Sequence, residues 1–259
     1  MALRTAPYRY LTEAQKCAFY DTMMTMKTEK ELVIFDVDGL LLDTEAVWMK
    51  AWKQTGDRLG IPDADAVFRK VAGISGEALR TVVYSCLSDH ALADKLIGQA
   101  RENGMKLLET ELQAKPGAAG MLAWLRARGV GIAVATTTVR GLTLDRLTRT
   151  GLLDQIDIMI CGDQVVNRKP DPEIYLTVLT AAGTAPDKAV VLEDSHYGVE
   201  AAYNAGIDCI QVPDLNPADD HTAELAVHVA DSLTEALAFM RENYAFRRHV
   251  YGLQNSDRQ

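Results

Sequence analysis

Leu32-Val33-Ile34-Phe35-Asp36-Val37-Asp38-Gly39 runs from four apolar residues into two carboxylates and a glycine. The apolar run predicts a buried parallel strand, because such strands are covered on both faces. Burial of a carboxylate is costly unless a cation or hydrogen bonds compensate it, so Asp36 and Asp38 at the strand's end need partners. A Mg²⁺ ion would be one, since Mg²⁺ usually binds through one or two carboxylates. The alternative is an ordinary Asx turn that Gly39 closes.

The composition is that of an ordinary globular protein with an acidic balance of charge. The 259 residues, 48% of them hydrophobic and 24% charged, can form one large domain or two modest ones. A formal net charge of -9 argues against nucleic-acid and anionic-membrane partners, which require a basic surface. The four cysteines are scattered without spacing typical of zinc sites or disulfide scaffolds. We therefore expect reduced thiols in a cytoplasmic protein.

Residues 1–30 read as an N-terminal extension of the folded domain. Thr12-Glu13-Ala14-Gln15 has the form of a capping box and predicts a helix that continues to about Lys27. Its aromatic and methionine side chains would need a surface to cover, either the core domain or a second subunit. We expect a monomer, with a dimer through the extension as the alternative. No secretory signal is apparent at the N-terminus, and no segment reaches the roughly 18 apolar residues of a membrane span.

The rest of the chain changes from helices alone to alternating strands and helices. Helical patterns cover Glu45–Leu59, 63–71, Gly76–Cys86 and 90–112. Further strands are predicted at Val130–Ala135, Ile156–Cys161, Ala189–Leu192 and Cys209–Val212. Helices are predicted before Gly151, at Pro172–Ala182, before Gly206 and after the capping box at 232–235. This order predicts an α/β fold, a doubly wound parallel sheet with an inserted all-helical domain. Residues 31–44 and 113–259 would form the α/β core, and residues 45–112 the helical insertion.

Polar residues follow several of the predicted strands and should meet at one edge of the sheet. In such sheets ligands bind beyond the carboxyl ends of the strands. Taken alone, the threonine run could be an ST-turn, the segment at Lys169 a rigid lead-in to a helix, and the segment at Glu193 a helix N-cap. Their shared location favours a site, because clustered carboxylates repel one another unless Mg²⁺ and a lysine lie between them. The groups are Asp36 and Asp38, Thr136-Thr137-Thr138, Glu193-Asp194-Ser195 and, from a loop, Lys169.

The motifs resemble those of the haloacid dehalogenase superfamily of phosphohydrolases, in the branch with a helical cap inserted after the first strand. The resemblance covers about residues 31–240. Four motifs occur in order at the expected element boundaries: Asp36-Val37-Asp38-Gly39 continuing to Asp43-Thr44-Glu45, Thr136, Lys169-Pro170-Asp171-Pro172, and Glu193-Asp194-Ser195 continuing to Gly198. The fold that the resemblance implies is a Rossmann-like core under a cap formed by residues 45–112.

The resemblance implies a role for each motif residue. Asp36 would be the nucleophile that forms an aspartyl-phosphate, and Asp38 the general acid and then the general base. Thr136 and Lys169 would bind the phosphoryl oxygens. The Mg²⁺ cofactor would lie on the Asp36 carboxylate, the Asp38 backbone carbonyl and Asp194, with Glu193 binding directly or through water. The substrate-binding residues would be Gly39, which permits close approach of backbone N–H groups, Thr137, and Gly73 and Ser75 in the cap.

The cap should set substrate choice, because it closes over the site. Gly73-Ile74-Ser75-Gly76 resembles a substrate-facing turn, although a plain helix–helix turn explains it equally well. The β-phosphoglucomutases of this branch have a histidine where this chain has Trp48, and a cationic residue where it has Gly76. The sequence is more similar to sugar-phosphate phosphatases such as the 2-deoxyglucose-6-phosphatase-like enzymes. Trp48 could equally be a core residue of the first cap helix.

Taken together, the sequence predicts a cytoplasmic, Mg²⁺-dependent phosphatase of small phosphorylated metabolites, with sugar or nucleoside phosphates as substrates. A phosphomutase of the β-phosphoglucomutase type is the alternative that would use the same site. A catalytically idle binding protein on this scaffold is the alternative from another class. The presence of Asp36, Asp38, Lys169 and Asp194 together argues against the idle protein, because decay of activity usually removes one of such a set.

Overall fold

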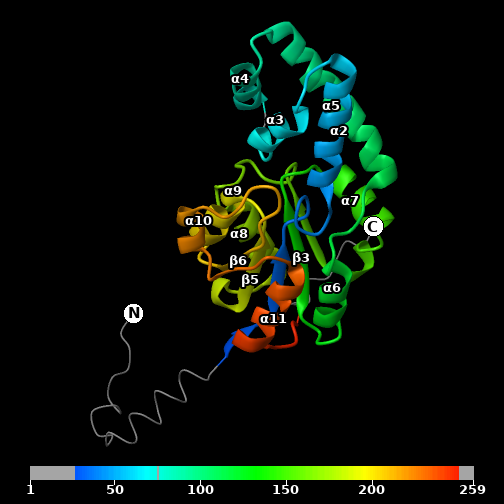
Figure 1. Ribbon diagram of the computed structural model, residues 1–259. Helices are drawn as coiled ribbons and strands as arrows, with labels where there is room; N and C mark the ends of the chain where they lie inside the picture. Colours follow the sequence, from blue (N-terminus) through cyan, green and yellow to red (C-terminus); the bar gives the residue numbers. More distant parts are fainter. Residues whose placement is uncertain (1–26, 75, 251–259) are drawn as a thin grey trace, which may run out of the picture.

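The computed structural model describes residues 27–74 and 76–250, and its centre is one parallel β-sheet. The six strands lie in the order β4-β3-β2-β5-β6-β7, and every neighbouring pair is parallel. Figure 1 shows this sheet between two layers of helices. The predicted α/β class with a doubly wound sheet is confirmed. The strands are β2 (Leu32–Phe35), β3 (Gly131–Thr136), β4 (Ile158–Cys161), β5 (Ala189–Glu193), β6 (Asp208–Gln211) and β7 (His228–Val229).

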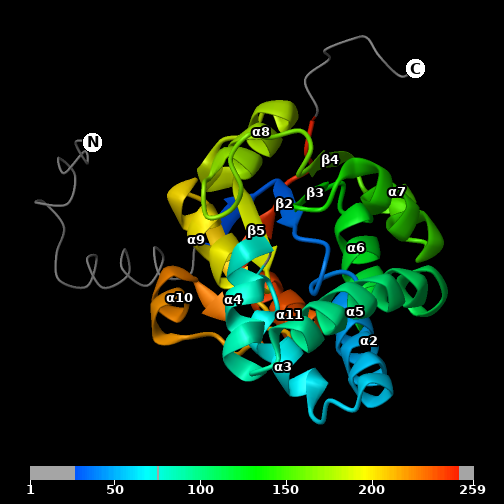
Figure 2. The same ribbon diagram turned by 90° about the horizontal axis from the view of Figure 1, so that it is seen from above.

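Strand β2 lies in the middle of the sheet and is fully buried, as its uninterrupted apolar sequence predicts. Val33 and Phe35 pack in the core on one face, and Leu32 and Ile34 pack in the core on the other. Figure 2 shows helices on both sides of the strands. The first face is covered by α6 (Ala118–Arg126), α7 (Arg140–Arg149) and α11 (Leu233–Asn243), and the second by α8 (Glu173–Ala182) and α9 (His196–Asn204).

Several short elements that the sequence patterns did not predict complete the core. The helix α6 and the short helix α10 (Asp220–Leu225) were missed, as were two 3-10 turns, η2 (Leu153–Gln155) and η3 (Pro186–Lys188). Strand β4 starts at Ile158 rather than at Ile156, because Ile156 is the C-cap of η2 and donates its backbone N–H to the carbonyl of Leu153. Ser232 is confirmed as the N-cap of α11, since its hydroxyl accepts a hydrogen bond from the backbone N–H of Glu235, while the Glu235 carboxylate accepts from the backbone N–H of Asp231.

Four helices form the cap over the carboxyl ends of the strands (Figures 1 and 2). They are α2 (Thr44–Leu59), α3 (Ala64–Val71), α4 (Gly76–Cys86) and α5 (His90–Glu111), close to the predicted ranges. They enclose a separate apolar cluster around Trp52, Phe68 and Leu96. Trp48 packs against this cluster, and a Cβ on Gly104 of α5 would lie 2.1 Å from its ring. Trp48 is therefore a packing residue of the cap.

The two chain segments that join cap and core lie side by side. The backbone N–H of Asp43 donates to the carbonyl of Gln113 at 2.9 Å, and that of Lys115 donates to the carbonyl of Leu41 at 2.8 Å. The Lys115 ammonium also lies 3.2 Å from Asp43 Oδ1 and 2.6 Å from Asp214 Oδ1. Asp214 belongs to the loop after β6, so its ion pair with Lys115 links the two connecting segments to a loop at the edge of the sheet.

The last residues of the predicted N-terminal extension, residues 1–30, form a strand of the folded core. Thr28–Lys30 forms strand β1, which pairs in parallel with β8 (Tyr244–Phe246) beside the main sheet. Lys30 is 1% exposed, and its ammonium lies 2.9 Å from Asp208 Oδ2. The pairing joins segments from opposite ends of the chain, which no local pattern in either segment indicates. The helix predicted from the capping box at 12–15 lies outside the described residues. Within residues 27–74 and 76–250, no helix is long and apolar enough to cross a membrane.

Candidate active site

The sheet register brings the predicted site residues together. Phe35 of β2 is paired with Val134 of β3 on one side and with Leu192 of β5 on the other. The next residues along these three strands therefore emerge at the same edge, beneath the cap. Asp36 and Asp38 follow β2, Thr136 ends β3, and Glu193 ends β5. Parallel pairing thus assembles groups that lie far apart in the chain.

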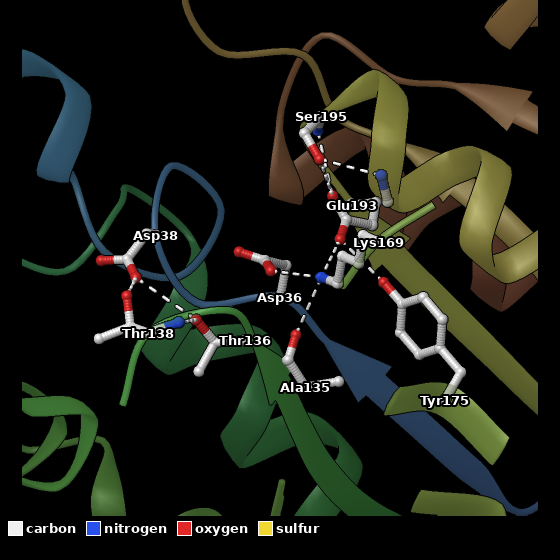
Figure 3. Close-up of polar contacts among 10 residues, drawn as sticks. Asp36, Asp38, Ala135, Thr136, Thr138, Lys169, Tyr175, Glu193 and Ser195 are labelled. Carbon is white, nitrogen blue, oxygen red and sulfur yellow. Dashed lines mark hydrogen bonds and ion pairs between the residues drawn. The ribbon is translucent and has the colours of Figure 1, made fainter. Parts of the chain in front are cut away.

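Lys169 is the centre of the polar contacts in Figure 3. Its ammonium donates to Asp36 Oδ1 at 2.6 Å, to the carbonyl of Ala135 at 3.0 Å and to Glu193 Oε1. The side chain is only 4% exposed, so its charge has to be paired within the protein. Burial opposes the charged ammonium, but the carboxylates of Asp36 and Glu193 outweigh this effect and raise the pKa of Lys169. The lysine predicted from the third motif therefore stays cationic beside Asp36.

Glu193 is completely buried, and protein donors contact both of its carboxylate oxygens. Besides Lys169, Oε1 accepts from the Tyr175 hydroxyl at 2.8 Å, while Oε2 accepts from the backbone N–H and the hydroxyl of Ser195 at 3.1 and 2.9 Å. A Cβ on Gly198 would lie 1.9 Å from the Glu193 carboxyl carbon, so glycine is required there. Of the two predicted modes of metal binding by Glu193, the water-mediated one fits this enclosure better. Tyr175 was not predicted, because it lies on the ordinary apolar face of α8.

Asp38 has a different set of partners from Asp36. Its Oδ2 accepts from the Thr138 hydroxyl at 2.6 Å and from the Thr136 hydroxyl at 3.4 Å, whereas its Oδ1 accepts from Arg146 Nη1 at 2.7 Å. Figure 3 shows the two threonines beside Asp38, away from Lys169. Neither Thr138 nor Arg146 was predicted to contact Asp38. The signal for Arg146 was its position on the buried side of an amphipathic helix, where a charge needs a partner.

Asp194 lies beside Gly39 without a donor of its own. Gly39 has φ +89, and a Cβ there would lie 2.3 Å from Asp194 Oδ2, so a larger residue would clash. Within the part of the chain that the structure describes, the Asp194 carboxylate has no hydrogen bond or ion pair. Burial and the charges of Glu193 and Asp36 raise its pKa well above the usual range. Burial likewise raises the pKa of Asp36 to about 7, against the opposing effect of Lys169.

These carboxylates fit a bound Mg²⁺ ion. No three His, Cys, Asp or Glu side chains form a metal-binding group within residues 27–74 and 76–250. Among the described residues, however, Asp36 Oδ2 and the Asp194 carboxylate accept no hydrogen bond, so both have oxygens free for a metal ion. Two carboxylates completed by a backbone carbonyl, water and phosphate oxygens are a usual donor set for Mg²⁺. The side chains of Asp38 and Glu193 are engaged by protein donors, which leaves the predicted backbone carbonyl of Asp38 and the water-mediated contact of Glu193 compatible with this set.

The remaining predicted substrate-binding residues are placed less tightly. Thr137 is exposed just beyond β3, and its backbone is close to Gly162, where a Cβ would lie 2.1 Å from the Thr137 carbonyl oxygen. Gly73 lies in the turn between α3 and α4, has φ +78, and would leave an added Cβ without a neighbour within 4 Å. The structure does not bring Gly73 into contact with the core carboxylates. Ser75, the other predicted cap residue, lies outside the described residues.

Comparison with known proteins agrees with this arrangement. The family model for haloacid dehalogenase-like hydrolases matches residues 33–212. The chain is 36% identical to the phosphorylated carbohydrates phosphatase of Thermotoga maritima, over 70% of this chain and 83% of that protein. It is 30% identical to the validoxylamine A 7'-phosphate phosphatase of Streptomyces hygroscopicus subsp. limoneus, over 82% of this chain and 93% of that protein.

A solved structure shares both the fold and part of the sequence. A proposed beta-phosphoglucomutase from Thermotoga maritima is similar with a TM-score of 0.69 and 33% identity, over 82% of this chain and 99% of that one. The sheet order, the helical cap and the four motifs are thus found together in this chain, as the resemblance implied. The chain belongs to the haloacid dehalogenase-like hydrolase family and is a phosphatase of that family.

Proposed function

We propose that the protein is a Mg²⁺-dependent phosphatase that hydrolyses small phosphomonoesters through an aspartyl-phosphate on Asp36. The observation that carries the proposal is the buried contact of Lys169 with both Asp36 and Glu193 at the strand edge. A lysine between two carboxylates, with one of them at the sheet edge beneath the cap, suits a site that accepts and releases a negative phosphoryl group.

Asp36 is suited to attack phosphorus. Its Oδ1 accepts from Lys169, while its Oδ2 accepts no hydrogen bond from the described residues. In the first step an oxygen of Asp36 forms a bond to phosphorus as the bond to the leaving oxygen breaks. Lys169 and the Thr136 hydroxyl stabilise the charge on the phosphoryl oxygens during this transfer. Water then attacks phosphorus, which releases phosphate and restores the Asp36 carboxylate.

Asp38 serves both steps as the proton carrier. It gives a proton to the leaving oxygen in the first step and takes one from the attacking water in the second. The Asp36 and Asp194 carboxylates and the Asp38 backbone carbonyl would hold Mg²⁺, and the Glu193 carboxylate would contact it through water. When bound, the ion supplies positive charge that keeps Asp36 ionised and neutralises the phosphoryl oxygens.

The proposed substrates are phosphorylated sugars and related small polyols. The support comes from two relatives, named for phosphorylated carbohydrates and for validoxylamine A 7'-phosphate, both at 30% identity or more. Hydrolysis is favoured over mutase chemistry because Trp48, which is partly buried, packs against the apolar cluster of the cap and beside Gly104, and supplies no charge to a substrate. The cytoplasmic location and the monomeric state predicted from the sequence stay predictions.

The test is phosphate release from a panel of phosphorylated metabolites, with the wild-type protein and with Asp36→Asn. The variant should keep its fold, because the amide is nearly isosteric with the carboxylate, and should lose turnover because it lacks the nucleophile. Fluoroberyllate should inhibit the wild type by mimicking a phosphoryl group on Asp36. Substantial turnover by purified Asp36→Asn would exclude Asp36 as the nucleophile, and with it the mechanism.

A further inference from the structure

We propose that Arg146 is a positioning residue for Asp38: it holds Oδ1 so that Oδ2 carries the proton toward the leaving oxygen. The inference rests on the proposed function, because it assigns a task to a contact of the proposed general acid. Arg146 lies outside the four motifs, in the middle of α7. Its Nη1 donates to Asp38 Oδ1 at 2.7 Å.

The position of Arg146 is fixed by the packing of α7. The residue is 6% exposed and lies on the same side of the helix as Thr143 and Leu147, which are completely buried. The Thr143 hydroxyl donates to the carbonyl of Val139 at 3.1 Å, so the start of the helix is held as well. A guanidinium on a buried helix face is costly unless it is paired. Arg146 therefore enters the site from a rigid element rather than from a loop.

The two oxygens of Asp38 have unequal surroundings. Oδ1 accepts from the guanidinium of Arg146, a group that has only donors and cannot accept a proton. Oδ2 lies 2.6 Å from the Thr138 hydroxyl and 3.4 Å from that of Thr136. A hydroxyl can accept as well as donate, so a proton on Oδ2 is tolerated there and one on Oδ1 is not. Thr136 is also proposed to bind the phosphoryl group, which places Oδ2 on the side of the reaction.

This arrangement gives Arg146 a specific part in the first step. The bond from Asp36 to phosphorus forms, the bond from phosphorus to the leaving oxygen breaks with its electron pair, and the proton on Asp38 Oδ2 passes to that oxygen. Without the guanidinium, Asp38 loses the contact that sets which of its oxygens faces the leaving group. Misplacement of a reacting group by about 1 Å can lower a rate by about 10²-fold.

The experiment compares phenyl phosphate with 4-nitrophenyl phosphate. The two esters have similar shapes, but phenolate is the poorer leaving group and depends more on a proton from the enzyme. The quantity measured is kcat/KM, which reports the steps up to formation of the aspartyl-phosphate. For Arg146→Met we expect kcat/KM to fall by about 10–10²-fold with phenyl phosphate and by about threefold or less with 4-nitrophenyl phosphate. Arg146→Lys should restore part of the loss, since it keeps a cation there.

Two further variants distinguish a loss of positioning from a loss of the folded structure. Thr138→Val removes the hydroxyl at Asp38 Oδ2 with little change of shape. Like Arg146→Met, it should lower kcat/KM more for phenyl phosphate than for 4-nitrophenyl phosphate. Arg140→Met is the matched control on α7, because Arg140 is exposed and its Nη1 donates to the carbonyl of Met159, outside the site. Arg140→Met should leave both kcat/KM values unchanged. Circular dichroism and thermal melting would verify that each variant is folded.

Asp38→Asn separates failure of this inference from failure of the proposed function. It should lower kcat/KM for phenyl phosphate by about 10²–10⁴-fold and affect 4-nitrophenyl phosphate much less. If Asp38→Asn leaves the substrate ratio unchanged, Asp38 is not the general acid and the proposed mechanism is wrong. If Asp38→Asn changes the ratio but Arg146→Met and Thr138→Val lower both substrates equally, the positioning role of Arg146 is wrong and the proposed function stands.

Discussion

Replacement of Lys169 by methionine should destabilise the fold in a pH-dependent way. The ammonium is the cation shared by Asp36 and Glu193, which are 8% and 0% exposed. Loss of one partner from a buried ion pair costs about 3–5 kcal/mol. Glu193 keeps its hydrogen bonds from Tyr175 and Ser195, so we expect the lower end of this range. For a chain of this size that corresponds to a fall in Tm of roughly 6–12 °C.

The sign of the pH dependence follows from the carboxylates. Burial already raises the pKa of Asp36 to about 7, and removal of Lys169 raises it further. A carboxyl group whose pKa is higher in the folded state than in the unfolded state, where it is about 4, binds more protons when folded. The folded state is therefore favoured as the pH falls. The full cost of burying an ionised Asp36 without its lysine applies only above the folded-state pKa of Asp36. The deficit of Lys169→Met relative to wild type should be larger at pH 8 than at pH 5.

The assay is thermal melting of both proteins at pH 5 and pH 8 in EDTA, so that a metal ion does not replace the missing charge. Lys188→Met is the matched control, because Lys188 is 40% exposed and lies 3.6 Å from the exposed Glu29. Its stability should stay within about 0.5 kcal/mol of wild type at both pH values. An equal deficit of Lys169→Met at the two pH values, or no deficit at all, would refute the reasoning from buried like charges.

Three other outcomes are expected. Chelation should stop turnover, which Mg²⁺ should restore fully and Ca²⁺ only poorly. Asp194→Ala should require far more Mg²⁺ for the same turnover. Activity that is unchanged in EDTA would contradict the metal site. Gly104→Ala should destabilise the cap by about 1–3 kcal/mol because its Cβ would meet the ring of Trp48, whereas Gly98→Ala, on the open side of the same helix, should stabilise it by about 0.5–1 kcal/mol in urea unfolding. With glucose 1-phosphate and a trace of glucose 1,6-bisphosphate, inorganic phosphate should appear faster than glucose 6-phosphate; the reverse would favour a mutase.

The fold class and the core of the candidate site could be predicted from the amino-acid sequence. The apolar run ending at Phe35 is typical of a strand covered on both faces, and the alternation of strands and helices after residue 130 indicates a parallel sheet. In such a sheet the carboxyl ends of the strands share one edge, so residues that follow different strands meet there. The places of Asp36, Thr136 and Glu193 at the ends of predicted strands were therefore enough to group them. Lys169 lies in a loop, and its place in this site was predicted from the motif Lys169-Pro170-Asp171-Pro172.

The pairing of these groups, in contrast, depends on how the helices pack against the sheet. Hydrogen-bond partners depend on side-chain directions to within an ångström, and sequence periodicity gives only the face on which a residue lies. The contact of Arg146 with Asp38 depends on the packing of α7 on the sheet, and the enclosure of Glu193 depends on the approach of Tyr175 on α8. The pairing of β1 with β8 likewise joins residues from opposite ends of the chain, a contact that neither segment encodes locally.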